Sequence, residues 1–234
     1  MKPLLEIDAL HAWYGASHVL HGVSLQIGEG EVVALQGRNG SGRSTLAKAI
    51  MGLVKMRGTL NFRGTSLAGW RPHRIARLGL GYVPERRDIF PTLTVRENLL
   101  LGTKSRAGRF GIEDAERLFP FLRERTRVPA GALSGGEQQM LALARTLVGD
   151  PTLVIVDEPA EGLAPQVVAQ LAASFGAMQE RGIAMLLIEQ RMTIARHLAT
   201  RVAVMGHGAI VFDGTPEALA KDDRVTNEWL SVGR

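Results

Sequence analysis

The segment from Gly37 to Thr45 has the residue types and the spacing needed to hold a phosphate group. It reads Gly-Arg-Asn-Gly-Ser-Gly-Arg-Ser-Thr, which fits the pattern G-x-x-x-x-G-K-[ST] except that Arg43 stands in the position of the lysine. Glycines let backbone N–H groups converge on phosphate oxygens, and a helix that begins near Ser44 would add its positive end. We therefore expect a phosphate-binding loop here, with the Ser44 hydroxyl available to Mg²⁺.

Two adjacent acids, Asp157 and Glu158, end an apolar run that begins at Leu153. Carboxylates at the C-terminal end of a parallel strand lie where open α/β sheets bind their ligands. Asp157 suits Mg²⁺, and Glu158 could accept a proton from an attacking water. An Asp-Glu pair after a strand more often belongs to an ordinary surface turn. Together with a phosphate-binding loop, however, it predicts a site that hydrolyses phosphate bonds.

A third motif, Leu133-Ser-Gly-Gly-Glu-Gln-Gln139, precedes an apolar helical stripe. Ser134 and Glu137 have the spacing of a capping box, in which each side chain bonds the other residue's backbone N–H. The plain interpretation is a well-capped helix. The two glycines at the helix start also leave backbone donors open, which favours an anion site.

Strands that alternate with helices must position these motifs, and this rhythm predicts one α/β domain over residues 1–234 with a mostly parallel sheet. We expect a core from about 1–85 and 149–234, with an antiparallel β subdomain at its N-terminal end, and a helical subdomain from about 86–148. Pro120 should interrupt the helical stripe in that insert. The expected strands lie within 4–36 and at 59–62, 153–156, 184–188, 202–205 and 209–212, and the expected helices at 46–53 and 165–180.

Composition and charge exclude several classes of protein. The chain has 45% hydrophobic and 22% charged residues, as globular proteins do, and no apolar run long enough to span a membrane. With no cysteine it has no disulfide or thiolate metal site, which favours a cytosolic location. The net charge is +5, but there is no basic block of five or six residues, so no nucleic-acid partner is expected.

The segment Ser134-Gly-Gly-Glu-Gln138, placed between a phosphate-binding loop and paired acids, resembles the signature of the ABC ATPases, and this resemblance covers essentially the whole chain. It implies the P-loop NTPase fold of that family, with ATP and Mg²⁺ as cofactors. The ATP-binding residues implied are Tyr14, Gly37, Arg38, Asn39, Gly40, Ser41, Gly42, Arg43, Ser44 and Thr45. The signature residues Ser134, Gly135, Gly136, Glu137 and Gln138 are implied to contact the ATP of a partner subunit.

Further positions gain roles from the same resemblance. Tyr14 corresponds to the aromatic that stacks on adenine, although it could also be a core aromatic. Glu85 stands where most families have a glutamine that touches Mg²⁺, so Ser44, Glu85 and Asp157 are the implied metal ligands. Gln190 occupies the position usually held by a switch histidine, and with Glu158 it forms the implied catalytic pair.

These departures are similar to those of the branched-chain amino acid importers. Val83-Pro-Glu85, Glu161-Gly-Leu-Ala-Pro165 and Ile188-Glu-Gln190 look like the second ATP-binding subunit of these importers, the LivF type. Urea and short-chain amide importers share much of the pattern and remain an alternative. The resemblance implies a second ATPase subunit (a copy or a paralogue), two membrane permeases and, indirectly, a periplasmic solute-binding protein. The expected location is peripheral, at the cytoplasmic face of the inner membrane.

Arg43 departs from the subfamily as well. Its charge should still attract ATP, but the planar guanidinium cannot occupy the point that a lysine ammonium takes between the β- and γ-phosphates. We therefore expect reduced turnover at the chain's own site, unless Arg43 is tolerated drift in a chain with only five lysines among 28 basic residues. A P-loop kinase or GTPase, or a soluble ABC protein that binds nucleic acid, are the alternatives from other classes. The first has no use for Ser134–Gln138, and the second generally carries two cassettes or a long coiled-coil insert.

Overall fold

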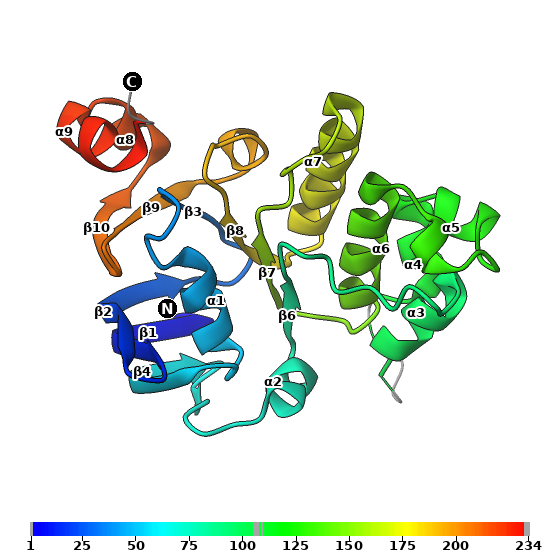
Figure 1. The fold of residues 1–234 in the computed structure, drawn as a ribbon, viewed down its shortest axis with the longest axis horizontal. Helices are drawn as coiled ribbons and strands as arrows, with labels where there is room; N and C mark the ends of the chain where they lie inside the picture. Colours follow the sequence, from blue (N-terminus) through cyan, green and yellow to red (C-terminus); the bar gives the residue numbers. More distant parts are fainter. Residues whose placement is uncertain (1, 105–107, 109, 232–234) are drawn as a thin grey trace.

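The structure, a computed structural model, describes residues 2–104, 108 and 110–231, and its centre is a six-stranded sheet (Figure 1). Five strands are parallel and the sixth, β10, pairs antiparallel with β9. The three central parallel strands, β3, β8 and β7, are short and buried along their whole length, as expected for a sheet that is covered on both faces. The order is β10 (Ala209–Gly214), β9 (Arg201–Gly206), β3 (Val32–Gly37), β8 (Ala184–Ile188), β7 (Leu153–Asp157) and β6 (Leu80–Val83).

A second, four-stranded antiparallel sheet carries the N-terminal part of the chain. Its order is β2 (Ser17–Ile27), β1 (Leu5–Tyr14), β4 (Lys55–Phe62) and β5 (Thr65–Ser66). In β1 and β2 buried residues are interspersed with exposed ones, which is typical of a sheet with one face in the core. β4 begins at Lys55, so it is longer than the strand predicted at 59–62.

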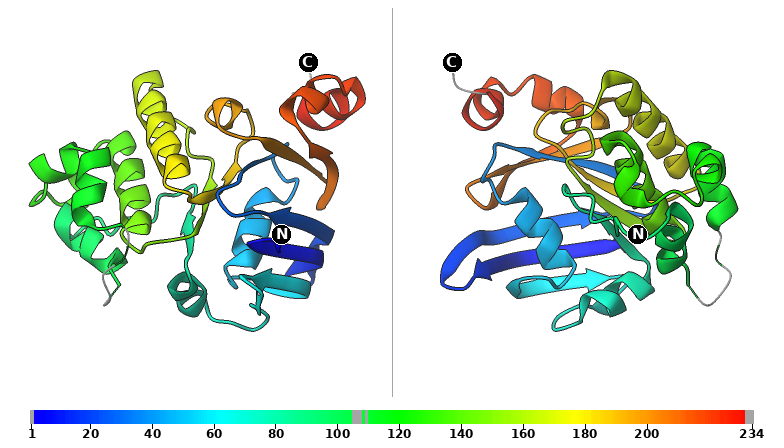
Figure 2. Two further views of the ribbon diagram at one scale, coloured as in Figure 1. Left: turned by 180° about the vertical axis from the view of Figure 1, so that it is seen from behind. Right: turned by 45° about the vertical axis from the view of Figure 1, so that its right-hand side comes forward.

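The helices between β6 and β7 stand at the opposite end of the molecule from the four-stranded sheet (Figures 1 and 2). The predicted break at Pro120 is confirmed, because α4 ends at Leu118 and α5 begins at Phe121. None of the helices in the described part of the chain is both long and apolar enough to cross a membrane. These insert helices are α3 (Val95–Gly102), α4 (Ile112–Leu118), α5 (Phe121–Glu124), the 3₁₀ turn Ala130–Ala132 and α6 (Gly135–Leu147).

The remaining helices pack around the central sheet. α1 ends at Ile50 instead of continuing to Leu53, because Gly52 takes a positive φ of 67° and turns the chain away, leaving Leu53 exposed. α2 and the C-terminal helices were not predicted from the sequence. The elements are α1 (Arg43–Ile50), α2 (Pro72–Leu78), α7 (Pro165–Glu180), the 3₁₀ turn Ala195–His197, α8 (Pro216–Ala220), α9 (Asp223–Val225) and a π-helical turn at Thr226–Leu230.

The six-stranded sheet separates two hydrophobic clusters. Val32 and Ala34 of β3 face the cluster that contains the helical insert and α7. Val33 and Leu35, the alternate residues, face the cluster formed with α1 and the four-stranded sheet. Since side chains alternate along a strand, one sheet packs against both layers and holds the strand ends that carry the site.

Candidate active site

The predicted phosphate-binding loop runs from the end of β3 into α1 and borders a cavity of about 380 Å³. A Cβ on Gly37 would lie 2.6 Å from Ser41 Oγ and 2.5 Å from the Met205 carbonyl oxygen, so this close turn requires glycine. A Cβ on Gly40, by contrast, would meet nothing within 4 Å, so the tip of the loop is open to a ligand. The cavity is lined by Tyr14, Val19, Asn39, Gly40, Ser41, Gly42, Arg43, Ser44, Thr45, Glu85, Glu158 and Glu161.

Asp157 ends β7 beside this loop and is 1% exposed. Its Oδ1 atom has no hydrogen-bond partner among the residues that the structure describes. Burial raises the pKa of Asp157, Ser44 beside it lowers the pKa, and the nearby charge of Glu85 raises it. A buried, unpartnered carboxylate oxygen next to a serine hydroxyl fits Mg²⁺, which usually takes one or two carboxylates and completes its shell with water and phosphate.

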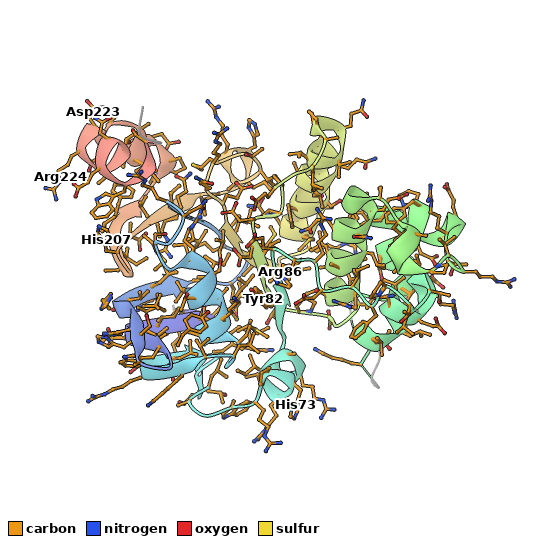
Figure 3. All side chains as sticks on the ribbon, in the orientation of Figure 1. His73, Tyr82, Arg86, His207, Asp223 and Arg224 are labelled. Carbon is orange, nitrogen blue, oxygen red and sulfur yellow. The ribbon has the colours of Figure 1, made fainter. Side chains whose placement is uncertain are left out.

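Glu85 follows β6 and reaches the same cavity from the side of the helical insert. Tyr82, which lies in β6 three residues before Glu85, is near the centre of the molecule together with Arg86 (Figure 3). Burial, and then the charge of Asp157, raise the pKa of the Tyr82 hydroxyl well above its usual value. Tyr82 is therefore neutral beside Asp157.

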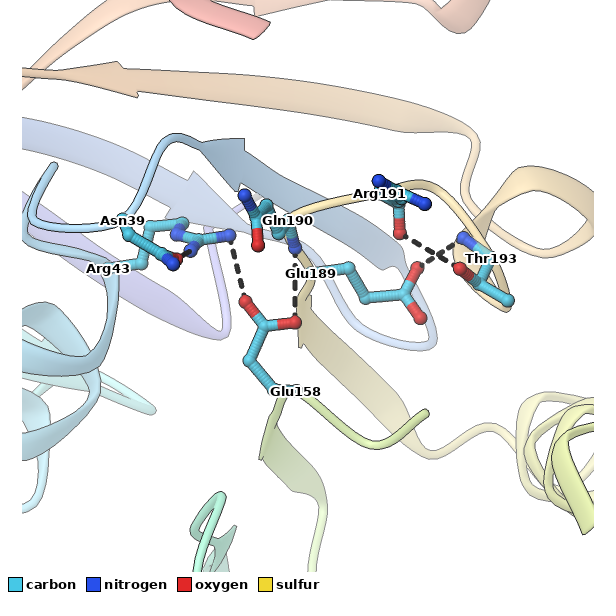
Figure 4. Close-up of polar contacts among 7 residues, drawn as sticks. All are labelled: Asn39, Arg43, Glu158, Glu189, Gln190, Arg191 and Thr193. Atoms are coloured by element: carbon cyan, nitrogen blue, oxygen red, sulfur yellow. Dashed lines mark hydrogen bonds and ion pairs between the residues drawn. The ribbon is translucent and has the colours of Figure 1, made fainter. Parts of the chain in front are cut away.

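Arg43, the first residue of α1, extends across the cavity to the second acid (Figure 4). Its Nη1 lies 3.0 Å from Glu158 Oε1, and its Nη2 donates a hydrogen bond of 3.3 Å to Asn39 Oδ1. The other carboxylate oxygen, Glu158 Oε2, accepts the backbone N–H of Gln190 at 3.1 Å. Burial raises the pKa of Glu158, while the Gln190 amide and the Arg43 charge lower it. Asn39, Arg43, Glu158 and Gln190 thus form one connected polar chain.

Glu189 is a functional candidate that the sequence reasoning missed. It is 2% exposed, and its carboxylate accepts backbone N–H groups from Thr193, Ile194 and Ala195 at 3.0–3.2 Å. Figure 4 shows the bond from Thr193. Burial raises the pKa of Glu189, and these amides lower it. Its role is to fix the turn that carries Gln190. An acid directly after an apolar strand, the same pattern as Asp157, was the signal available.

The signature motif begins α6 and does not line the phosphate cavity described above. The predicted capping box is present: Glu137 N donates to Ser134 Oγ at 3.3 Å, and Ser134 N donates to Glu137 Oε2 at 2.9 Å. Gly136 has no room for a side chain, since a Cβ there would lie 2.8 Å from Val167 of α7. Gln138 donates to the carbonyl oxygens of Leu133 and Ala130 and braces the segment before the helix.

The structure therefore brings most of the expected ATP and metal residues together at one sheet edge. Tyr14 lies at the cavity wall with 45% of its surface exposed, in a position open to a flat ligand. Gly37 and Arg38 form the base of the loop without lining the cavity, and Gln190 joins the site through Glu158. Ser134–Gln138 do not line this cavity.

The chain has relatives of known family. The family model described as ABC transporter matches residues 20–161. BraG of Pseudomonas aeruginosa, a high-affinity branched-chain amino acid transport ATP-binding protein, is 37% identical over 231 residues, which cover 97% of this chain and 99% of that protein. A protein of Archaeoglobus fulgidus named as a probable branched-chain amino acid transport ATP-binding protein, LivF, is 32% identical over 98% of this chain and 99% of its own length.

Solved structures share the fold. A nucleotide-free ATP-binding cassette from an ABC transporter superposes with a TM-score of 0.83 at 25% identity, over the full length of both chains. An ATP-binding cassette in its ADP conformation gives 0.81 at 26% identity, over 97% of this chain and 98% of that one. The chain belongs to the ABC transporter family, as an ABC ATPase of the LivF type.

Proposed function

We propose that this ATPase binds MgATP between its phosphate-binding loop and its paired acids, and couples hydrolysis to the import of amino acids, branched-chain ones first. The observation that carries this proposal is the open loop tip beside the buried, unpartnered Asp157 oxygen. Two relatives that align along the whole chain are named for branched-chain amino acid transport, which favours this cargo over urea or short-chain amides.

The chain's own residues divide the work of such a site. Backbone N–H groups of Gly40–Thr45 and the start of α1 would hold the phosphates. Ser44 and Asp157, with Glu85 nearby, would hold Mg²⁺, which supplies charge neutralisation for the phosphate oxygens when bound. Tyr14 would stack on the base. Glu158 would take the proton of the attacking water, and Gln190 would orient that water.

The position of the signature supports a second ATP-binding subunit as partner. Ser134 and the α6 N-terminus are not part of the chain's own cavity, so they are free to stabilise charge on a nucleotide held by another subunit. A copy or a paralogue would place two such sites between two chains. Two permeases and a periplasmic solute-binding protein complete the proposed importer, with this subunit at the cytoplasmic face of the inner membrane.

The segment after Glu85 is the proposed contact with the permeases. Phe90 is 49% exposed, yet its backbone is fixed, because the buried Asn98 side chain bonds both its N–H and its C=O. An exposed aromatic on a rigid segment is suited to a partner surface. The same segment leads directly from the cavity, so contact there can reach the nucleotide.

Reconstitution tests the proposal. The chain, assembled in vesicles with candidate permeases and a partner ATPase from the same organism, is supplied with a solute-binding protein and labelled leucine, urea or acetamide. We expect MgATP-dependent uptake of leucine alone. Uptake of urea or acetamide in its place would overturn the cargo, and absence of MgATP binding to the chain would overturn the function.

A further inference from the structure

Trp229 packs on the hairpin turn between β9 and β10. A Cβ on Gly206 would collide with atoms of the Trp229 ring, so this ring covers the glycine directly. His207, which is labelled in Figure 3, meets the same ring edge-on, with 5.1 Å between the two ring centroids. The π-helical turn that carries Trp229 also contacts β9 and β3. The C-terminal segment therefore covers the turn at residues 206–208.

The covered turn is bonded to the predicted phosphate-binding loop. The Gly208 N–H donates to the Ser41 carbonyl oxygen at 2.9 Å. Met205, which directly precedes Gly206, pairs with Gly37 where β3 ends and the loop begins. The β9–β10 hairpin therefore holds this loop both at its first residue and at Ser41.

The bond to Ser41 fixes the direction of a backbone donor at the cavity. The Ser41 carbonyl and the Gly42 N–H belong to one trans peptide unit, so they point in opposite directions. Because the carbonyl is bonded to Gly208, the Gly42 N–H points away from the hairpin turn. Gly42 lines the cavity, and the N–H groups of this loop are the proposed donors to the nucleotide phosphates.

We infer that Trp229 is a positioning residue of the phosphate-binding loop, which it holds in place through the turn at residues 206–208. The inference rests on the proposed function and adds to it a residue that does not line the cavity. Without the ring, the turn is free to move away from Ser41, and the Ser41–Gly42 peptide unit is free to rotate. Binding of the phosphates then has to order this donor again, which lowers the affinity.

A double-mutant cycle on the full chain tests the inference. Trp229→Ala deletes the ring, Trp229→Phe keeps an aromatic ring, and Gly206→Ala displaces the ring without deleting it. These variants and the double variant Gly206→Ala/Trp229→Ala are measured for MgATP affinity by equilibrium dialysis and for hydrogen exchange of the amides at 206–209. Trp70→Ala is the matched control, because Trp70 is also half-buried and lies beside Gly52, at the opposite end of α1 from the loop. Circular dichroism confirms that each variant is folded.

We expect Trp229→Ala and Gly206→Ala each to weaken MgATP binding by about 5-fold, the factor that corresponds to the loss of one ordinary hydrogen bond. Amide exchange at 206–209 should become faster by about the same factor. Adding Gly206→Ala to Trp229→Ala should change the affinity by less than about 2-fold, because the ring that the methyl group would displace is already gone. Trp229→Phe and Trp70→Ala should bind MgATP as the native chain does.

The fluorescence of Trp229 gives a second measurement. The chain has three tryptophans, so Trp229 is the sole one left when Trp13→Phe and Trp70→Phe are combined. We expect saturating MgATP and inorganic pyrophosphate to change the Trp229 emission, because both place phosphate on the loop. Adenosine has no phosphate and should leave the emission unchanged.

Four results would overturn the inference. They are native MgATP affinity in Trp229→Ala, an equal loss of affinity in Trp70→Ala, an effect of Gly206→Ala that is the same with and without the Trp229 ring, and a Trp229 emission that bound MgATP leaves unchanged. In each case the native chain still binds MgATP, so the proposed function stands. Absence of MgATP binding to the native chain would instead overturn the function itself.

Discussion

Replacing Asp114 by Asn should loosen the attachment of the helical insert to the core. The Asp114 carboxylate accepts the Gly111 N–H at 2.9 Å and pairs with Arg117 at 2.8 Å and with Arg181, at the end of α7, at 3.1 Å. Arg181 also lies over the ring of Phe110, 5.0 Å from its centroid. One carboxylate therefore joins α4 of the insert to α7 of the core.

The size of the effect follows from the pKa. The Gly111 amide, and then Arg117 and Arg181, lower the pKa of Asp114 from 3.8 to about 2. One pKa unit corresponds to about 1.4 kcal/mol, so the upper bound is about 2.5 kcal/mol. Since Arg117 and Arg181 are 64% and 42% exposed, water screens both pairs, and we expect a loss of about 1 kcal/mol at pH 7.

The sign of the pH dependence is fixed by the lowered pKa. The stabilisation is fully present above the unfolded-state pKa near 3.8, and it disappears as pH falls through about 2, where the native carboxylate is protonated. Urea unfolding of native chain and Asp114→Asn between pH 7 and pH 2.5 measures this. The gap in unfolding free energy should be constant down to about pH 4.5 and then shrink.

Glu113→Gln is the matched control. Glu113 is the neighbour of Asp114 on the same helix and is partly exposed, so this variant removes the same charge without removing the contacts of Asp114. It should leave the unfolding free energy within about 0.5 kcal/mol of the native value. The reasoning would be refuted if Asp114→Asn and Glu113→Gln were equally stable at pH 7, or if their gap were unchanged at pH 2.5.

Four further predictions concern the site. Tyr14→Ala should weaken MgATP binding by about 10-fold, since stacking on a base contributes roughly 1–3 kcal/mol, whereas Tyr14→Phe should bind as the native chain does; equal affinities by dialysis would contradict the stacking role. Asp157→Asn should reduce Mg²⁺ affinity by at least about 10-fold in a metal titration followed by nucleotide binding, and an unchanged Mg²⁺ requirement would remove Asp157 from the metal site. Glu189→Ala should accelerate hydrogen exchange of the amides at 193–195 by about 10-fold or more, because bonds to a charged acceptor contribute about 1.5–3 kcal/mol; unchanged protection would show that the turn holds itself. Phe90→Ala should lower transport several-fold while MgATP affinity is retained, and normal transport in vesicles would place the permease contact elsewhere.

The sequence predicted those parts of the site that are encoded by contiguous residues. The predicted phosphate-binding loop and the capping box of Ser134 and Glu137 are each formed by residues that are close in sequence, so the spacing of those residues predicts them. The pairing of Arg43 with Glu158 is not, because it depends on β8 lying between β3 and β7 in the sheet. The order of the strands in the sheet cannot be predicted from the spacing of residues along the chain.

The errors in the helices have local physical causes. α2 buries only Ile75 among its residues, so it shows no hydrophobic periodicity, although Pro72 at its first position was a start signal. α1 was expected to extend to Leu53 because an apolar residue stands there at helical spacing. The positive φ of Gly52 turns the chain out of the helix before Leu53, and Leu53 is therefore exposed.

The two hydrophobic clusters on opposite faces of the central sheet allow the side chains of one cluster to change size without disturbing the packing of the other. Successive apolar residues of β3 belong to different clusters, so a change of volume at Val32 is absorbed on the insert side and a change at Val33 on the side of α1. Repacking of the helical insert can thus leave the packing beneath the loop between β3 and α1 unchanged.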